Sequence, residues 1–250
     1  MRQNAIELYQ PINILKQVGE DIWLVDGPIV KMSMYGAKVP FPTRMTIVRL
    51  SNGELWCHSP TELTQELKTQ IDSLGLVRHL ISPIKFHYTH IGTWAKAYPE
   101  CIVWASPGVR DRAAQQKVEA RFDADLDNEP PFQWDAELDQ LVFQGSRFMD
   151  EIVFFHRKSS TLILTDLIEN FELDKVSKRF GWLTKVVGIA DPDGQTPLDL
   201  RMTFWGRKEQ ARSCFKRMLQ WNPEKVILAH GRWYEEDGVA ELHRAFRWLE

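Results

Sequence analysis

The chain has 250 residues, of which 44% are hydrophobic and 26% are charged, and its formal net charge at pH 7 is −3. This composition is typical of a globular protein with a sizeable core, and the charge excludes the concentrated basic surface that general nucleic-acid binding requires. No apolar run approaches the roughly 20 residues that span a bilayer, and the N-terminal residues lack an apolar signal core. We therefore expect a cytoplasmic protein that binds neither a membrane nor nucleic acid.

The first part of the chain predicts extended structure interrupted by one loop. Alternating apolar and polar residues around 22–25 predict a strand at a sheet edge, and glycine and proline residues predict an irregular loop over 36–44. A β-hairpin follows, which joins a strand over 44–50 to a strand over 54–59. The Asn-Gly pair at 52–53 supplies the positive φ angles of its turn.

The next stretch alternates helices with strands. A helix over 59–75, with Ser59 or Thr61 as its N-cap, is followed by a strand over 77–84 that ends in a loop with two histidines. A short helix and a strand over 101–105 come next. This order implies parallel strands with helices packed on the faces of the sheet.

The second half of the chain contains one long polar segment and then regular elements again. Residues 109–140 predict a surface helix and a long connection, which is either a lid over a site or a surface excursion. Residues 167–205 show a mixed pattern. The remaining strands and helices are expected at 141–145, 152–156, 161–166, 206–221, 226–229 and 241–250.

Three of the predicted strands end in side chains that bind metals. His87 and His90 follow the first of these strands, Asp166 ends the second, and His230 ends the third. The histidine pair alone also fits two hydrogen-bonded loop residues, but three strand ends with suitable ligands favour a metal site. Two imidazoles and one carboxylate leave a fourth position open for water, as in a catalytic zinc site.

The order of these motifs resembles the metallo-β-lactamase superfamily, and more closely its branch described as the domain of unknown function DUF4336. The resemblance covers about residues 20–235 and implies a single domain over 1–250. It also implies the α/β fold of that superfamily, an αββα sandwich of two mixed sheets with helices on the outer faces. The residues that carry it are Pro83, His87, Trp94, Pro99, Glu100, Ser106-Pro107-Gly108, Asp166 and the hairpin from Phe155 to Leu162.

The chain departs from the superfamily at several ligand positions. The first metal motif of the superfamily reads His-x-His-x-Asp-His, whereas this chain has Lys85 in place of the first His and Thr89 in place of the Asp. A further His of the superfamily has no direct counterpart, and Asp150, Glu151 or His156 are the candidates to replace it. The positive charge of Lys85 near the abandoned position would partly substitute for a lost ion.

These departures imply one divalent ion, zinc or iron, rather than two. We expect His90, Asp166 and His230 to bind it, with His87 nearby or as a fourth ligand, and we expect Asp166 and Lys85 to serve in catalysis. The resemblance then implies a metal-dependent hydrolase that acts on a small-molecule ester, thioester or phosphoester. The alternative is a degenerate, non-catalytic binding module with the same fold, which the substituted metal motif supports.

Overall fold

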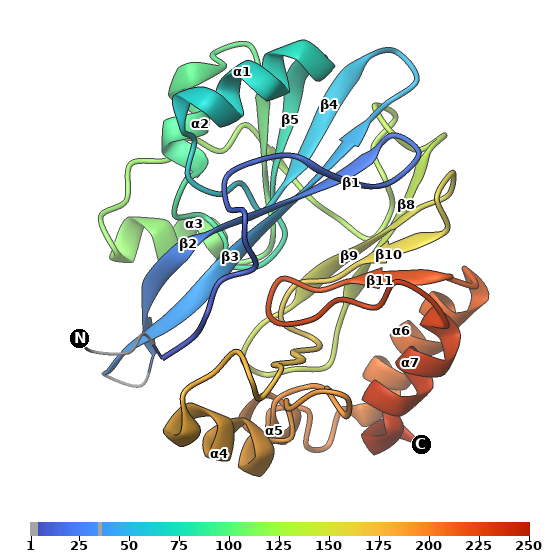
Figure 1. The fold of residues 1–250 in the computed structure, drawn as a ribbon. Coiled ribbons are helices and arrows are strands. Elements are labelled where there is room, and N and C mark those ends of the chain that lie inside the picture. The colour runs from blue at the N-terminus through green and yellow to red at the C-terminus, as the bar shows by residue number, and fades with distance from the viewer. Residues whose placement is uncertain (1–4, 35–36) are drawn as a thin grey trace.

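The structure is a computed structural model that describes residues 5–34 and 37–250. Two β-sheets pack face to face and helices cover their outer faces, so the predicted αββα sandwich is confirmed (Figure 1). In the described part of the chain, no helix combines the length and the apolar character that crossing a membrane would need.

The first sheet comes from the N-terminal half of the chain. Its first four strands pair antiparallel and the strands from β4 to β7 pair parallel. The helices α1 (Gln65–Leu74), α2 (Ile91–Ala97) and α3 (Val109–Gln115) accompany this sheet. In spatial order the strands are β1 (Lys16–Gly19), β2 (Ile22–Met34), β3 (Ala37–Arg49), β4 (Glu54–His58), β5 (Leu76–Ser82), β6 (Ile102–Ala105) and β7 (Ala124–Asp125).

The second sheet comes from the C-terminal half. Its strands lie in the order β11 (Lys225–Ile227), β10 (Thr161–Ile163), β9 (Glu151–His156) and β8 (Leu138–Phe143), with only β10 and β11 parallel. In Figure 1 the helices α6 and α7 cover this sheet and α4 and α5 lie at the lower end of the molecule. Their bounds are α4 (Lys178–Val187), α5 (Leu198–Met202), α6 (Lys208–Gln220) and α7 (Gly238–Ala245), followed by a 3-10 turn at Arg247–Leu249.

Aromatic side chains fill the space between the two sheets. Trp56 of β4 meets Phe154 of β9 edge to face, with 4.8 Å between the ring centroids. Trp134, from the long polar segment, is 1% exposed and packs against Trp104 of β6. The segment 109–140 thus contributes to the core between the two sheets.

Two expectations for the N-terminal strands are wrong. Residues 37–44, expected in an irregular loop, belong to β3, where Pro42 pairs with Ile29 and Pro40 pairs with Lys31; Gly36 lies outside the described residues. The prolines are tolerated because β4 pairs only with Thr46 to Arg49, so this part of β3 has a free edge that requires no N–H donor. The strand around 22–25 is not at the sheet edge, since β1 pairs with its outer side.

The helix after β4 begins later than expected. Its N-cap is Thr64, whose side-chain oxygen accepts the backbone N–H of Leu67, and neither Ser59 nor Thr61 caps it. The carbonyl of Thr61 instead accepts the indole N–H of Trp94 at 2.7 Å, which fixes α2 against this segment. Because Ser59 does not cap this helix, its hydroxyl is available for the contact with His87 that is described below.

Candidate metal centre

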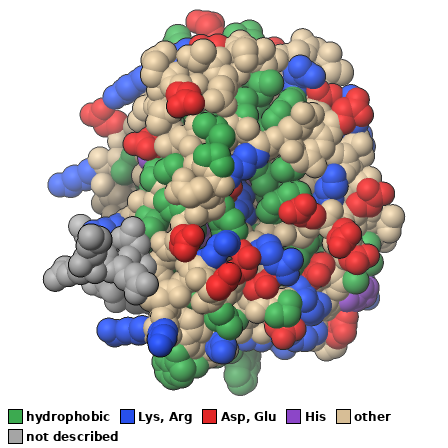
Figure 2. Space-filling view, in the orientation of Figure 1, with side chains coloured by type: hydrophobic (Ala, Val, Ile, Leu, Met, Phe, Trp, Pro, Cys, Tyr) green, Lys and Arg blue, Asp and Glu red, His purple; other side chains and the backbone are tan. Residues whose placement is uncertain are grey.

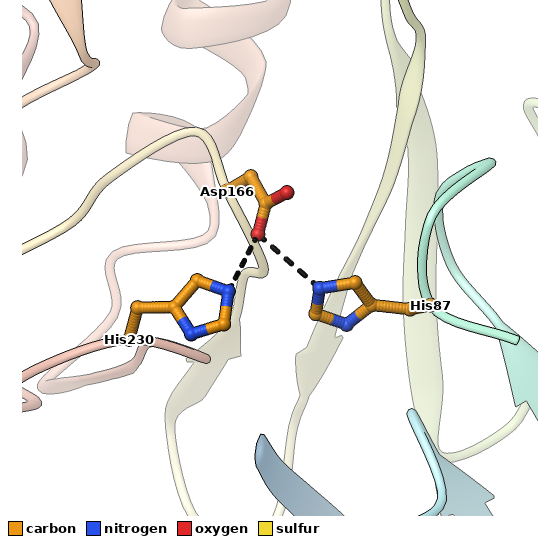
Figure 3. Close-up of side chains that lie close together, drawn as sticks. All are labelled: His87, Asp166 and His230. Carbon is orange, nitrogen blue, oxygen red and sulfur yellow. Dashed lines mark ion pairs between the residues drawn. The ribbon is translucent and has the colours of Figure 1, made fainter. Parts of the chain in front are cut away.

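Three strand ends from the two sheets bring His87, Asp166 and His230 together (Figure 3). His87 follows β5 of the first sheet, while Asp166 and His230 follow β10 and β11 of the second. The Nε2 atom of each histidine lies 3.3 Å from the same Asp166 oxygen, Oδ1, and the potential ligand atoms all lie within 4.8 Å of one another. We call these three residues the ligand cluster.

The polar atoms of the ligand cluster suit a divalent cation. Asp166 Oδ1 is buried, yet no hydrogen bond from the described residues satisfies it, although two imidazole nitrogens face it. A buried acceptor in this state is costly unless a positive charge or a donor reaches it. Burial raises the pKa of Asp166, but His87 and His230 outweigh that effect and lower the pKa below its usual value, so the group is a carboxylate. Two imidazoles and a carboxylate fit zinc or iron.

Ser59 orients the ring of His87. The Ser59 hydroxyl lies 2.7 Å from Nδ1 of His87, which leaves Nε2 directed at Asp166. Ser59 follows β4 directly and has a φ of 54°, in the left-handed region. Metal-binding histidines commonly engage their second nitrogen in this way, because the contact fixes both the tautomer and the direction of the ring.

Glu151 holds the loop that carries Asp166. Its carboxylate accepts the backbone N–H groups of Thr165, Asp166 and Leu167, at 2.6, 2.9 and 3.0 Å. Glu151 is 1% exposed; burial and the nearby Asp166 charge raise its pKa to about 7, although the N–H groups act in the opposite direction. Both carboxylate oxygens are used by the loop, so Glu151 supports a ligand and lies outside the ligand cluster itself.

Arg44 holds the loop that carries His230. Its Nη1 atom donates to the carbonyl of Leu228 at 2.7 Å and to that of Gly231 at 2.8 Å, so it spans His230. Its Nε atom donates to Asp26 at 2.8 Å, and the guanidinium is almost completely buried. The sequence reasoning missed the positions that Glu151, Arg44 and Ser59 take around the ligand cluster.

The other candidates for the missing histidine also lie outside the ligand cluster. Asp150 is half-buried, and burial raises its pKa despite the nearby charges of Arg207 and Lys85. His156 lies at the opposite end of β9 from Glu151, and its Nδ1 contacts the Ser159 hydroxyl at 2.8 Å. Within the described residues, the structure therefore places three ligands together and adds no fourth carboxylate or histidine.

His90 and Lys85 are directed elsewhere. His90 is the N-cap of α2. Burial lowers its pKa, and the charge of Glu62 acts in the opposite direction. We expected His90 to lie beside Asp166 and His230, but the structure places His87 there. His90 lies at the start of α2 and so is held away from the ligand cluster. The ammonium group of Lys85 donates to the Phe148 carbonyl and lies 4.1 Å from the centre of its ring. Its catalytic role stays a prediction.

Comparisons with known proteins agree with this fold. The family model described as "Domain of unknown function (DUF4336)" matches residues 20–177, and no curated protein matches the chain. The DIM-1 metallo-β-lactamase exposed to ceftazidime is 15% identical, with a TM-score of 0.65, over 99% of this chain and 98% of that one. The mono-zinc form of FIM-1 from Pseudomonas aeruginosa is 13% identical, with a TM-score of 0.61, over 100% and 99%. At such identities the likeness shows the shared metallo-β-lactamase fold alone.

Proposed function

This chain belongs to the DUF4336 family and has the metallo-β-lactamase fold, and from that premise we propose that it is a metal-dependent hydrolase with a single-ion site. The observation that carries the proposal is the pair of histidine Nε2 atoms, each 3.3 Å from one Asp166 oxygen that lacks a hydrogen bond in the described chain. The mono-zinc form of FIM-1 supports it, because it is a solved protein of this fold with one zinc. The substrate we propose is a small-molecule ester or a related acyl compound.

Each residue of the ligand cluster and its surroundings would have a separate role in hydrolysis. His87, Asp166 and His230 would hold a divalent ion, which when bound polarises the scissile carbonyl and lowers the pKa of water. Ser59 keeps the Nδ1 side of His87 engaged, so that Nε2 faces the site. Asp166 and His230 both line the adjoining cavity, which places a carboxylate beside any group that enters it. The second oxygen of that carboxylate would accept a hydrogen bond from the nucleophile and so orient it.

A non-catalytic binding module is the second candidate. The hydrogen bonds of Glu151 favour this candidate. Both Glu151 oxygens accept backbone N–H groups, so Glu151 could not serve as a ligand of a second ion. The exposed side chain of Thr89 offers no carboxylate at the position where the superfamily motif has one. Metal content combined with turnover separates the two candidates.

The proposed function is tested with a panel of p-nitrophenyl esters, thioesters and phosphoesters, using protein loaded with Zn²⁺ or Fe²⁺. We expect ester hydrolysis that chelation abolishes, that the added ion restores, and that Asp166→Asn lacks. Glu172→Gln is the control that should retain activity. It changes a half-buried carboxylate that accepts a hydrogen bond from the Tyr9 hydroxyl. Full metal loading without turnover of any compound would favour the binding module.

A further inference from the structure

An apolar cavity of about 210 Å³ adjoins the ligand cluster. Asp166 and His230 form part of its wall, so the cavity opens directly onto the proposed reacting position. The rest of the wall is mainly hydrophobic and comes from both halves of the chain, including Phe41, Phe86, Phe148, Phe180, Ile189 and Leu200. An apolar protein cavity of ~150 Å³ is large enough to bind benzene. This cavity therefore has room for one aromatic ring or a short alkyl chain.

The wall contains three acidic side chains, those of Asp166, Glu169 and Asp199. No lysine or arginine from the described part of the chain lines the cavity. An anionic group that enters such a space loses its hydration and meets charges of its own sign. Among the described residues, the wall has no lysine or arginine that would compensate for this cost. An uncharged group pays neither penalty.

Glu169 is a buried polar group in this wall that lacks a partner. Its side chain is 8% exposed, and no hydrogen bond from residues 5–34 or 37–250 acts on its carboxyl group. Burial, and then the charges of Asp166 and Asp199, raise its pKa well above the usual range. A polar group buried without a partner in an apolar wall is suited to form a hydrogen bond with a ligand, here with an uncharged oxygen or nitrogen.

The apolar wall of the cavity reaches the molecular surface at α4. Leu183 of α4 lines the cavity and is 46% exposed, and hydrophobic side chains gather at the lower edge of the molecule where α4 lies (Figure 2). On the same helix, Val186 is 52% exposed but does not line the cavity. Leu183 thus extends the apolar wall of the cavity to the surface of the molecule.

We propose that this cavity binds the uncharged, apolar part of the substrate, a short alkyl chain or a single aromatic ring, and presents an attached ester or thioester to the ligand cluster. The cavity can be tested alone, but its assignment to a substrate rests on the proposed function. Hydrolysis would join the oxygen of water to the acyl carbon and break the bond from that carbon to oxygen or sulfur. The proton released from water would go to the leaving alcohol or thiol. This class excludes phosphoesters, whose anionic group the acidic wall disfavours.

Binding is tested first, by calorimetry on chelated protein with 1-octanol, octanoate and octylammonium at pH 7. We expect 1-octanol to bind at least about tenfold more tightly than octanoate. Leu183→Glu should weaken 1-octanol binding roughly fivefold or more, whereas Val186→Glu, the matched change outside the cavity, should leave it unchanged. Octanoate binding as tightly as 1-octanol, octylammonium binding more tightly than both, or equal effects of the two variants would overturn the proposal.

Turnover then separates this inference from the proposed function. With metal-loaded protein, kcat/KM for p-nitrophenyl esters should rise from acetate to hexanoate, and Leu183→Glu should reduce that rise while Val186→Glu preserves it. Binding of 1-octanol with no hydrolysis of any ester would retain the cavity and reject the hydrolase. Hydrolysis that does not depend on acyl length would retain the hydrolase and reject the cavity as the place where the acyl group binds.

Discussion

Two neighbouring groups of side chains in the candidate centre are held in very different ways. In the ligand cluster, each of the three residues sits on a loop or turn with a buried or partly buried polar support, namely Ser59, Glu151 or Arg44. The second group comprises Lys85, Thr89 and His90. Thr89 is exposed, Lys85 contacts Phe148, and His90 begins α2 with its Nε2 atom buried and, within the described chain, unpaired.

This difference indicates which residues the fold organises for a ligand. Bringing two imidazoles and a carboxylate together has a cost in electrostatics and in loop entropy, and the supports offset that cost before any ion arrives. In the part of the chain that the structure describes, the side chains of the second group do not converge on one point, and Lys85 is bound instead to the Phe148 carbonyl. A residue type suited to metal binding is therefore weaker evidence than the hydrogen bonds that hold it in place.

The largest effect is expected from Arg44→Met, which removes the support of the His230 loop. The change leaves the buried Asp26 with only Lys16 as an ion-pair partner, and breaking a buried pair costs roughly 3–5 kcal/mol. Urea unfolding measures the loss. Arg49→Met on the same strand is the control, because Arg49, which pairs with Asp21, is 43% exposed and the pair should contribute less than about 1 kcal/mol. Equal losses in the two variants would show that Arg44 is not a special support.

The next effect is expected from Glu151→Gln, which keeps the size of the side chain but removes one of its acceptor oxygens and its charge. We expect the free energy of unfolding to fall by roughly 2–4 kcal/mol and metal affinity to fall by about 10- to 100-fold. Glu137→Gln is the control, since Glu137 also accepts a backbone N–H, that of Ser51, but at the surface. An unchanged metal affinity in Glu151→Gln would contradict the role of Glu151 in positioning Asp166.

The pH dependence of stability provides a separate test of Glu151 in chelated protein. Its pKa is raised from 4.5 to about 7 on folding, so between these values the folded state binds more protons than the unfolded state. The stability of the wild type should therefore fall as pH rises from about 4.5 to about 7, by an amount on the order of 2 kcal/mol relative to Glu151→Gln. Thermal or urea unfolding across this range gives the difference. A difference independent of pH would argue against a raised pKa.

A smaller effect is expected from Ser59→Ala, which removes only the hydroxyl that contacts Nδ1 of His87. Metal affinity should fall about tenfold, with little change in stability, because the ring loses its orientation but keeps its packing. Ser106→Ala is the matched control: Ser106 also follows a strand of the first sheet, and its buried hydroxyl has no partner among the described residues. Competition with a chromogenic chelator measures both metal affinities. The same affinity in the two variants would show that Ser59 does not position His87 for metal binding.

The fold and the position of the site were largely accessible from the sequence. The apolar strands that precede His87, Asp166 and His230 predict their approach, because the ends of these strands meet in an αββα sandwich. A spacing of three residues could not decide between His87 and His90, since the choice depends on where α2 begins. The family resemblance is confirmed by the match over residues 20–177.

The supports and the cavity could not be predicted because they depend on distant contacts. Arg44 and Gly231 are 187 positions apart, and Glu151, considered first as a metal ligand, is used by backbone groups that no local pattern reveals. Ser59 looked like a helix cap because it precedes a helical segment. The stretch 167–205 looked mixed because the apolar side chains of α4 face both the cavity and the surface, which obscures a single buried stripe.

The most direct test of the ligand cluster is the metal content of the wild type, His87→Ala and His90→Ala, measured by elemental analysis on protein purified without chelator. The two variants remove the same side chain from positions three residues apart, and circular dichroism confirms that both are folded. We predict close to one zinc or iron per chain in the wild type and in His90→Ala, and almost none in His87→Ala. Loss of the ion in His90→Ala with retention in His87→Ala, or no ion in the wild type, would contradict this prediction.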